Sequence, residues 1–390
     1  MIIENRLFCI IFWLCFLLSP TLLIAQEGDI QITNLSSGET VGYELLLIKG
    51  IVSENTKEVT VSSAGQVSSW PAAGGKFKVL TYLKKGSNEL LLQARNHKDK
   101  MITIIYNPIK SKKFARLVYI IPLNHKENGN DRFMAPEGEA NDIESAKKRL
   151  RLAGLMLQTA CAELTYKAGL GRRTFRLDRD DKGQVKVVVH VSSKTIEELH
   201  AIQKPSYALF DYFKDEELTY LPDSENSVVI MMSSITRYQP GQSVKAGGAW
   251  GASGRNPAAW IHSANLFTWA EDISQVIRRF SDTRDPRKLN MLDDSKGRHT
   301  LWACYSTTCG ALIHELGHVF RLSHNDGGDN SYAIMRRGFD RFNRIFMAQD
   351  GKDKDYDDEN IGWAPKSAVK LKKTPFLHLP NTKFLGDSND

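Results

Sequence analysis

The sequence has few cysteines, few prolines and, after residue 25, no apolar run long enough to cross a membrane. With 13 Pro and 28 Gly in 390 residues it is not a collagen, and the missing apolar spans exclude a polytopic membrane protein. Hydrophobic residues make up 42% and charged residues 25%, proportions that exclude a disordered chain. We therefore expect a folded protein of two or three domains.

Several motifs of known chemistry are also missing. No G-K-[ST] follows the glycine-rich segment 247–254, which excludes a phosphate loop, and no G-x-S-x-G motif supports serine catalysis. The 52 basic residues exceed the 45 acidic ones, giving a net charge of +7. This excess favours anionic partners such as extracellular glycans, or serves solubility alone. The basic pairs are scattered, so we expect no nucleic-acid partner.

Residues 1–25 read as a secretory signal peptide, because an apolar run from Leu7 is broken by Pro20 and ends at the small Ala25. We therefore expect a secreted protein, and membrane attachment only if this segment stays uncleaved. The sequon at Asn34 is consistent with export. Cys304 and Cys309 could be bridged in an oxidising compartment, whereas Cys161 lies in a helical apolar pattern and should be a buried thiol.

The pattern after the signal peptide predicts two domains. Residues 26–108 show short strands separated by turn residues, which predicts an immunoglobulin-like β-sandwich for spacing or docking. A polar linker, 109–113, follows. Residues 114–370 alternate strands with helices and predict an α/β domain, and 371–390 reads as a polar tail. The predicted strands are 29–33, 42–52, 58–62, 76–83, 89–94, 101–106, 115–122, 185–191 and 228–232, with helices at 141–167 and 195–203.

The residues that carry chemistry are in the segment His314-Glu315-Leu316-Gly317-His318. Two histidines four apart lie on one helix face and can both bind zinc. The glutamate between them can take a proton from water that the metal activates. Hydroxyls in the segment 306–308 could cap the start of this helix. A third histidine, His324, lies ten residues after His314, and three histidines plus one open position make a catalytic zinc site.

The string HELGHVFRLSH, followed by AIM at 333–335, resembles the metzincin pattern with its methionine turn. The wider string from STTCGALIHELGHVF to IMRRGFDRFNRIF is similar to a eukaryotic family of zinc metallopeptidases whose activity is inferred from the motif. The resemblance spans about 114–364. It implies a metzincin-like peptidase domain, one zinc per chain held by His314, His318 and His324, Glu315 as general base, and Met335 beneath the metal.

Arg321 departs from this pattern, because metzincins have glycine there, in a left-handed backbone conformation. Either Arg321 adopts that turn, which costs on the order of 1 kcal/mol, or His324 is not a ligand and a downstream acid such as Glu359 replaces it. The segment 247–254 could be a cleft edge or an ordinary loop. An oxyanion-stabilising residue could be any of Tyr332, Arg336, Arg337 and Asn343.

The sequence thus predicts a secreted zinc-dependent endopeptidase that acts on protein or peptide substrates. A zinc hydrolase acting on another amide or ester, and an inactive zinc-binding protein in which the sandwich is the functional part, are the alternatives.

Overall fold

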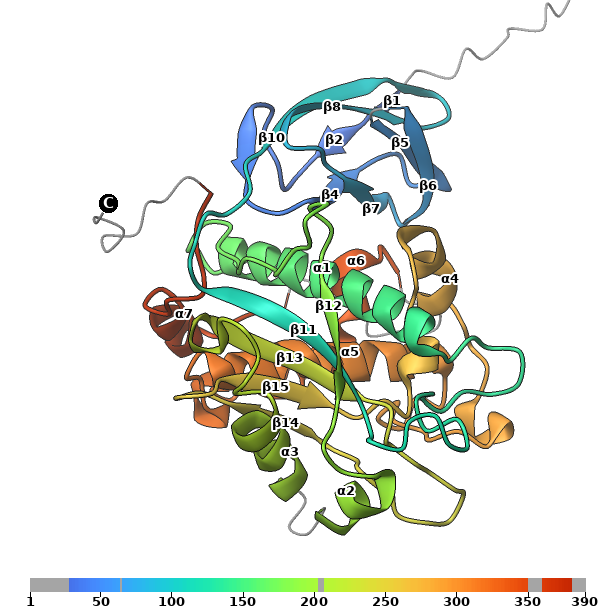
Figure 1. The fold of residues 1–390 in the computed structure, drawn as a ribbon. Coiled ribbons are helices and arrows are strands. Elements are labelled where there is room, and N and C mark those ends of the chain that lie inside the picture. The colour runs from blue at the N-terminus through green and yellow to red at the C-terminus, as the bar shows by residue number, and fades with distance from the viewer. Residues whose placement is uncertain (1–27, 64, 203–206, 350–359, 381–390) are drawn as a thin grey trace, which may run out of the picture.

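The computed structural model describes residues 28–63, 65–202, 207–349 and 360–380. The predicted signal peptide and Glu359 lie outside these residues. The described chain forms an all-β region, at the top of Figure 1, and a mixed α/β region below it. No helix in these ranges is long and apolar enough to cross a membrane.

The described residues from 28 to 106 are all β, as the sequence predicts, whereas their immunoglobulin-like identity stays a prediction. Eight strands share one hydrogen-bonded order, β2-β4-β7-β6-β5-β8-β10-β3, and β1 pairs with β9. The sequence pattern misses β6, which contains Pro71. This strand pairs with β5 up to Pro71 and with β7 from Ala72, so the residue without an N–H lies where the strand changes partner.

The strands of this region are short, and several turns join them. Their bounds are β1 (Gly28–Asp29), β2 (Gln31–Ile32), β3 (Glu39–Val41), β4 (Leu45–Ile51), β5 (Glu58–Ser63), β6 (Gln66–Ala73), β7 (Lys76–Tyr82), β8 (Gly86–Gln93), β9 (His97–Lys98) and β10 (Lys100–Tyr106).

A five-stranded sheet of order β12-β11-β13-β15-β14 is the centre of the α/β region. Its first four strands are parallel, and β14 is an antiparallel edge strand. The chain order β11-α1-β12-α2-α3-β13 confirms the predicted alternation. The bounds are β11 (Phe114–Ile121), α1 (Ile143–Lys167), β12 (Val187–Val191), α2 (Ile196–Ile202), α3 (Ala208–Tyr212), β13 (Ser227–Ser233), β14 (Ala249–Ala252), β15 (Ala258–Ile261), α4 (Val276–Phe280), α5 (Leu301–Val319), α6 (Asn343–Phe346) and α7 (Pro365–Leu371).

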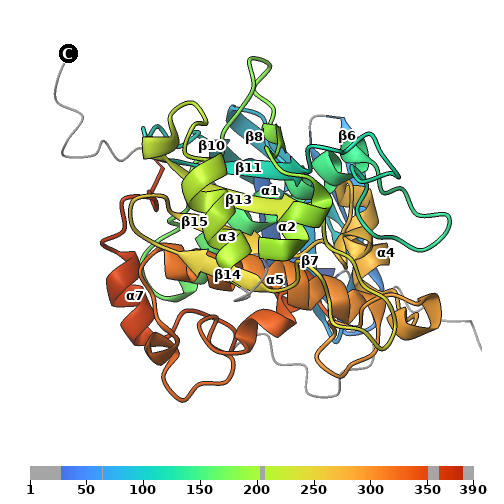
Figure 2. The same ribbon diagram turned by 60° about the horizontal axis from the view of Figure 1, so that its bottom comes forward.

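Helices cover both faces of this sheet, because its strands are apolar on both sides. In β11, Leu117 and Tyr119 belong to the apolar cluster that includes α1 and α5. Val118 and Ile120 alternate with them and pack in a second cluster with α2 and α3. Figure 2 shows α2 and α3 in front of the sheet. The result is three layers, with α5 held between the sheet and the C-terminal segments.

The all-β region packs directly against α1, so the linker 109–113 is not the only connection. One apolar cluster runs through both regions. Thr159 of α1 donates to the Leu45 carbonyl at 2.5 Å, and the buried Glu163 accepts from the Asn34 side chain at 3.0 Å. Asn34 is itself buried, and its amide nitrogen also donates to a backbone carbonyl. The Asn34 side chain is therefore bound inside the folded protein.

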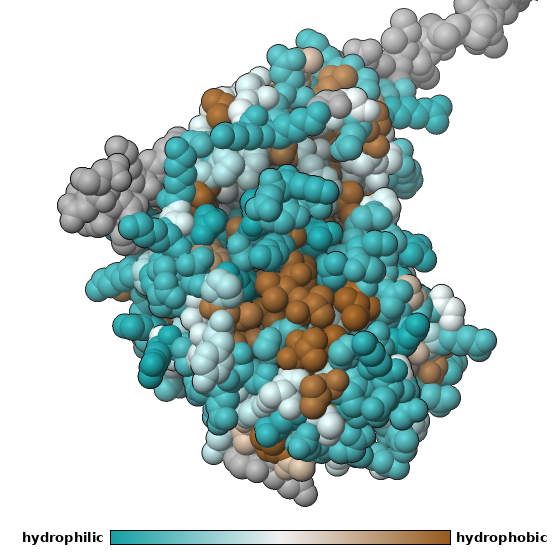
Figure 3. All heavy atoms as spheres, in the orientation of Figure 1, coloured by the Kyte–Doolittle hydropathy of each residue, from teal (hydrophilic) through white to brown (hydrophobic). Residues whose placement is uncertain are grey.

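The predicted tail is wrong for its first residues. Leu377 and His378 are buried, and His378 exchanges backbone hydrogen bonds with Thr174. The fold therefore continues at least to residue 380. Figure 3 shows hydrophobic residues gathered in the middle of one face, in the part of the view where Figure 1 shows β11 to β13.

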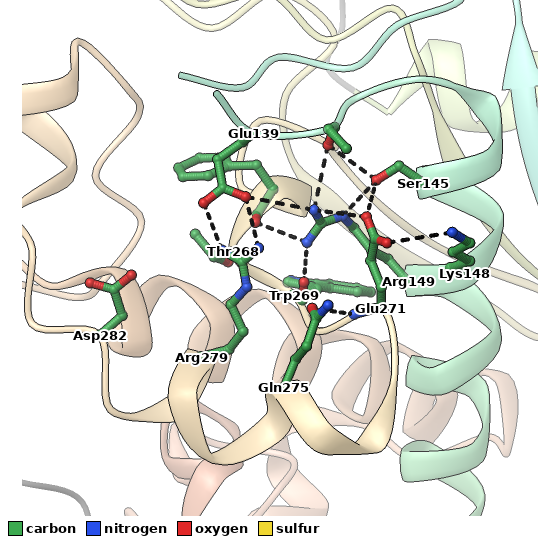
Figure 4. Close-up of polar contacts among 12 residues, drawn as sticks. Glu139, Ser145, Lys148, Arg149, Thr268, Trp269, Glu271, Gln275, Arg279 and Asp282 are labelled. Carbon is green, nitrogen blue, oxygen red and sulfur yellow. Dashed lines mark hydrogen bonds and ion pairs between the residues drawn. The ribbon is translucent and has the colours of Figure 1, made fainter. Parts of the chain in front are cut away.

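A buried charge cluster joins α1 to the segment that precedes α5 (Figure 4). Arg149 is 1% exposed, pairs with Glu271 at 3.2 Å and donates to the backbone carbonyls of Phe267 and Trp269. Burial lowers the pKa of Arg149 to about 10. The Trp269 indole in turn donates to Thr308 of α5 at 2.9 Å. The cluster therefore fixes the position of the α5 helix relative to α1.

We expect Arg149→Met to lower the free energy of unfolding by about 3–5 kcal/mol, because Glu271 and two carbonyls lose their buried partner. Urea unfolding measures this. The control is Lys148→Met, a neighbour that is 56% exposed and 3.8 Å from the same carboxylate. It should cost less than about 1 kcal/mol. Equal losses in the two variants would show that the buried cluster does not hold this part of the fold.

Candidate metal centre

The helix α5 carries His314 and His318 on one face, one turn apart. It begins earlier than the sequence predicts, with Thr300 at the N-cap position, so the segment 306–308 is inside the helix. There the Ser306 hydroxyl donates to the Asp340 carbonyl at 2.8 Å instead of capping the helix. The predicted cap is therefore wrong, and these hydroxyls connect α5 to its neighbours.

Cys304 and Cys309 are both buried thiols on this same helix. Five residues turn a helix by about 140° beyond a full turn, so the two side chains point in different directions. The bridge that the sequence leaves possible is therefore absent from the structure, where both are free cysteines. Cys161 is a buried thiol, as predicted, and burial raises its pKa to about 12.

Arg321 adopts the left-handed turn, with a φ of 67°. This turn ends α5 and sends the chain back to a short 3-10 helix that begins at His324. Of the two alternatives that the sequence leaves open, the structure favours the one in which His324 joins the helix histidines. Ser323 and Asp326 form a capping box that holds the returning segment.

The Nε2 atoms of three histidines converge. His324 Nε2 lies 3.1 Å from His314 Nε2 and 3.2 Å from His318 Nε2. Three nitrogens bound to one tetrahedral zinc ion at about 2.0–2.1 Å lie about 3.3 Å apart, so the three side chains fit the metal. Among the described residues, these three histidines are the group of His, Cys, Asp or Glu side chains whose ligand atoms lie close enough together to hold a metal ion.

Backbone carbonyls fix the tautomers of the two helix histidines. His314 Nδ1–H donates to the Ile334 carbonyl at 2.7 Å, and His318 Nδ1–H donates to the Leu322 carbonyl at 2.9 Å. Each Nε2 is then left with a lone pair for a cation. Burial lowers the pKa of His314 to about 4 and also lowers the pKa of His318, so both rings are neutral at pH 7.

Met335 lies beneath the cluster, fully buried, at the end of the same segment that supplies the Ile334 carbonyl. A Cβ atom at Gly317 would lie 2.2 Å from the Met335 sulfur, so the glycine between the two histidines makes room for the thioether. Met335 therefore packs against the helix turn between the two histidines, and its role as a methionine turn stays a prediction.

A cleft of about 660 Å³ opens beside the histidines. Glu315 lines it, and burial raises the pKa of this carboxyl to about 8 in the protein without a cation. The glycine-rich segment is a cleft edge, because Gly248 and Ala249 also line the cleft. A Cβ at Gly251 would lie 2.2 Å from the Glu315 carbonyl oxygen, so β14 packs on the α5 backbone.

Of the four residues proposed for oxyanion stabilisation, Arg336 lines the cleft, and its guanidinium has no ion pair or hydrogen bond within the described chain. Arg337 also lines it but is bound to Asp340 at 2.7 and 2.8 Å. Asn343 is buried and bonded to Ser306, and Tyr332 stacks against Arg341. Of the four, Arg336 is thus the one whose side chain lines the cleft without being bound to another residue of the described chain, so it is the best candidate for stabilising an oxyanion.

The sequence reading misses two cleft residues, His262 and Asp294. His262 directly follows β15, and its Nε2–H donates to Asp294 at 3.1 Å. Burial opposes ionisation of Asp294, but this hydrogen bond lowers its pKa overall. His262 could have been noticed, because a polar residue after a buried parallel strand often lies at a binding edge. Asp294 lies in a loop without such a signal.

The sequence matches the model of a family described as "Putative peptidase family" over residues 29–389. The chain belongs to this family. It is 25% identical over 349 residues to a "Putative zinc metalloproteinase" of Schizosaccharomyces pombe, covering 83% of this chain and 54% of that protein. It is 23% identical to one of Saccharomyces cerevisiae, covering 83% and 49%. The chain thus spans about half the length of these relatives.

Among solved structures, this chain is similar to wild-type OgpA from Akkermansia muciniphila, with 18% identity and a TM-score of 0.40. The match covers 72% of this chain and 66% of that one. The zinc metalloproteinase relatives and the histidine cluster together support zinc as the cofactor of this chain.

We expect one zinc ion per purified chain, and its loss in His314→Ala, His318→Ala and His324→Ala, because each variant removes one of three converging nitrogens. Elemental analysis after dialysis measures this. His125→Ala, outside the cluster, is the control and should keep the metal. Zinc retained in His324→Ala would contradict the three-histidine site.

Proposed function

We propose that this chain is a zinc-dependent endopeptidase in which His314, His318 and His324 hold the metal. The observation that carries the proposal is the convergence of three Nε2 atoms at a cleft that Glu315 also lines. When bound, zinc supplies a Lewis acid that polarises a carbonyl and makes water acidic enough to lose a proton near pH 7. Family membership supports a peptide as the substrate.

Glu315 acts as the general base and then as the acid. Within the described residues its carboxyl makes no hydrogen bond that would hold it elsewhere, and it lies on the same helix turn as the two ligands. Its high pKa in the metal-free protein comes from burial, and a nearby divalent cation favours the ionised form. The carboxylate can therefore accept a proton from water and return it to the leaving amine.

The substrate lies along β14. This strand is at the end of the sheet, and its first residue, Ala249, lines the cleft. An extended peptide can add to such an edge through main-chain hydrogen bonds, which do not depend on its side chains. The pairing would carry a scissile carbonyl past the histidines.

We expect Glu315→Gln to keep zinc but lower kcat by about 10²–10⁴-fold, because the amide cannot take the proton. Cleavage of a mixed peptide library, followed by mass spectrometry, and zinc content are measured on the same samples. Glu137→Gln, an exposed glutamate outside the cleft, should behave as the wild type. Normal cleavage by the Glu315→Gln protein would exclude this residue as the base. A zinc-loaded wild type that cleaves no peptide would instead favour another amide or ester substrate.

Export is also proposed, from the apolar segment 1–25 alone. Expression of the full chain with its own N-terminus should yield a mature protein in the medium that begins near Gln26, as N-terminal sequencing would show. A cell-retained protein that still begins at Met1 would contradict this.

A further inference from the structure

A second hollow, also about 660 Å³, lies at the C-terminal end of α5. Its floor is apolar, with the buried Val319 and Phe320 and the half-buried Phe376. Five cationic side chains line it, from four separate parts of the chain: Lys113, Arg255, Arg321, Lys370 and Lys373. The sequence alone gave no sign of this grouping, because its basic residues look scattered.

Most of this positive charge is not neutralised by the protein. Glu225 is the acidic residue among those lining the hollow, and Asp326 binds Lys370 at 2.7 Å. Lys113 donates to the Glu225 backbone carbonyl, and Asp215, near Arg255, is paired with Lys214. Arg255, Arg321 and Lys373 are exposed and have no ion pair within the described chain. The hollow therefore offers three free cations over an apolar floor.

The backbone conformation of Arg321 is a separate observation that favours a ligand at this hollow. Its backbone is left-handed, a conformation in which glycine would be less strained. The chain nevertheless has a long cationic side chain here, and that side chain lines the hollow. A strained residue at a cleft indicates a functional constraint, and the guanidinium is the part of Arg321 that glycine could not supply.

One strand connects this hollow to the metal cleft. β14 begins with Ala249, which lines the cleft, and the turn after it, Ser253–Arg255, lines the hollow. Only Ala249–Ala252 is strand, and the chain then turns, so the path from Ala249 to Arg255 is at most about 20 Å, the length of about six extended residues. A peptide bound along β14 at the metal would therefore reach the cations with residues within about six positions of the bond that is cut.

We propose that this hollow, here called the basic hollow, binds an acidic segment of the peptide substrate within about six residues of the scissile bond. The inference rests on the proposed peptidase function and adds a substrate preference to it. Carboxylates of the substrate pair with Arg255, Arg321 and Lys373, and an apolar neighbour contacts the floor. Both sites are then occupied by one extended chain.

Binding is tested with the zinc-loaded Glu315→Gln protein and two fluorescent ten-residue peptides, one ending in four glutamates and one with glutamines in their place. Fluorescence anisotropy should give about tenfold tighter binding of the glutamate peptide, with the difference shrinking as salt rises. The preference should be lost in Arg255→Gln/Lys373→Gln. The control pair Lys366→Gln/Lys372→Gln removes the same charge from exposed residues outside the hollow and should keep it.

Arg321→Gly separates a binding role from a structural one. It should unfold at the same temperature as the parent or higher, because it relieves the left-handed strain, and yet bind the glutamate peptide more weakly. If it binds as the parent does, Arg321 is not part of the site. Equal binding of the two peptides by the parent would overturn the proposal.

Two further readouts distinguish other outcomes. If a heparin oligosaccharide binds and the hollow variants lose it, while the peptides show no difference, the hollow holds an anionic glycan and the peptide assignment is wrong. In library cleavage by the wild type, acidic residues should be enriched on one side of the cut, within about six positions of it. The anisotropy assay needs no hydrolysis, so failure of the peptidase function would appear separately as an uncut library.

Discussion

The arrangement depends on one constraint: three imidazole nitrogens must meet with their lone pairs facing one another. Without a cation the lone pairs repel one another, so the protein must fix the orientation of each ring through its other nitrogen. For His314 and His318 it does so with the Ile334 and Leu322 carbonyls, which accept the Nδ1 protons. Both carbonyls come from segments that follow α5. The metal centre therefore exists only when the chain after the helix has folded back onto it.

This folding back requires very close packing around α5, and glycines permit it. A Cβ at Gly310 would lie 2.0 Å from the Phe339 carbonyl oxygen, one at Gly317 would meet Met335, and one at Gly251 would meet the helix backbone at Glu315. Three different segments thus contact the helix closely, each at a point where either the helix or the segment has a glycine and therefore no Cβ. The buried position of Glu315 and its raised pKa are consequences of the same packing.

The parts of the site that could be predicted are those set by local spacing. The pair His314 and His318 follows from helix periodicity, and the position of His324 follows once Arg321 is accepted in a left-handed turn. The α/β alternation and most strands follow from apolar patterns. The start of α5 was missed because hydroxyls that look like caps serve tertiary hydrogen bonds instead. β6 was missed because Pro71 looks like a strand breaker, although it lies where the strand changes partner.

What could not be predicted is what the tertiary fold brings together from distant parts of the chain. The basic residues look uniformly scattered in sequence, but the fold gives two groups of them surroundings that the sequence does not show. Arg149 and Arg172 are buried and paired with Glu271 and Glu163, so their charge is used within the protein. Five other cations gather at the end of α5, and three of them, Arg255, Arg321 and Lys373, have no ion pair within the described residues. An excess of positive charge that serves solubility alone would be spread over the surface. The grouping of five cations at the end of the metal-binding helix, joined to the cleft by β14, is better explained by a ligand that reaches both places.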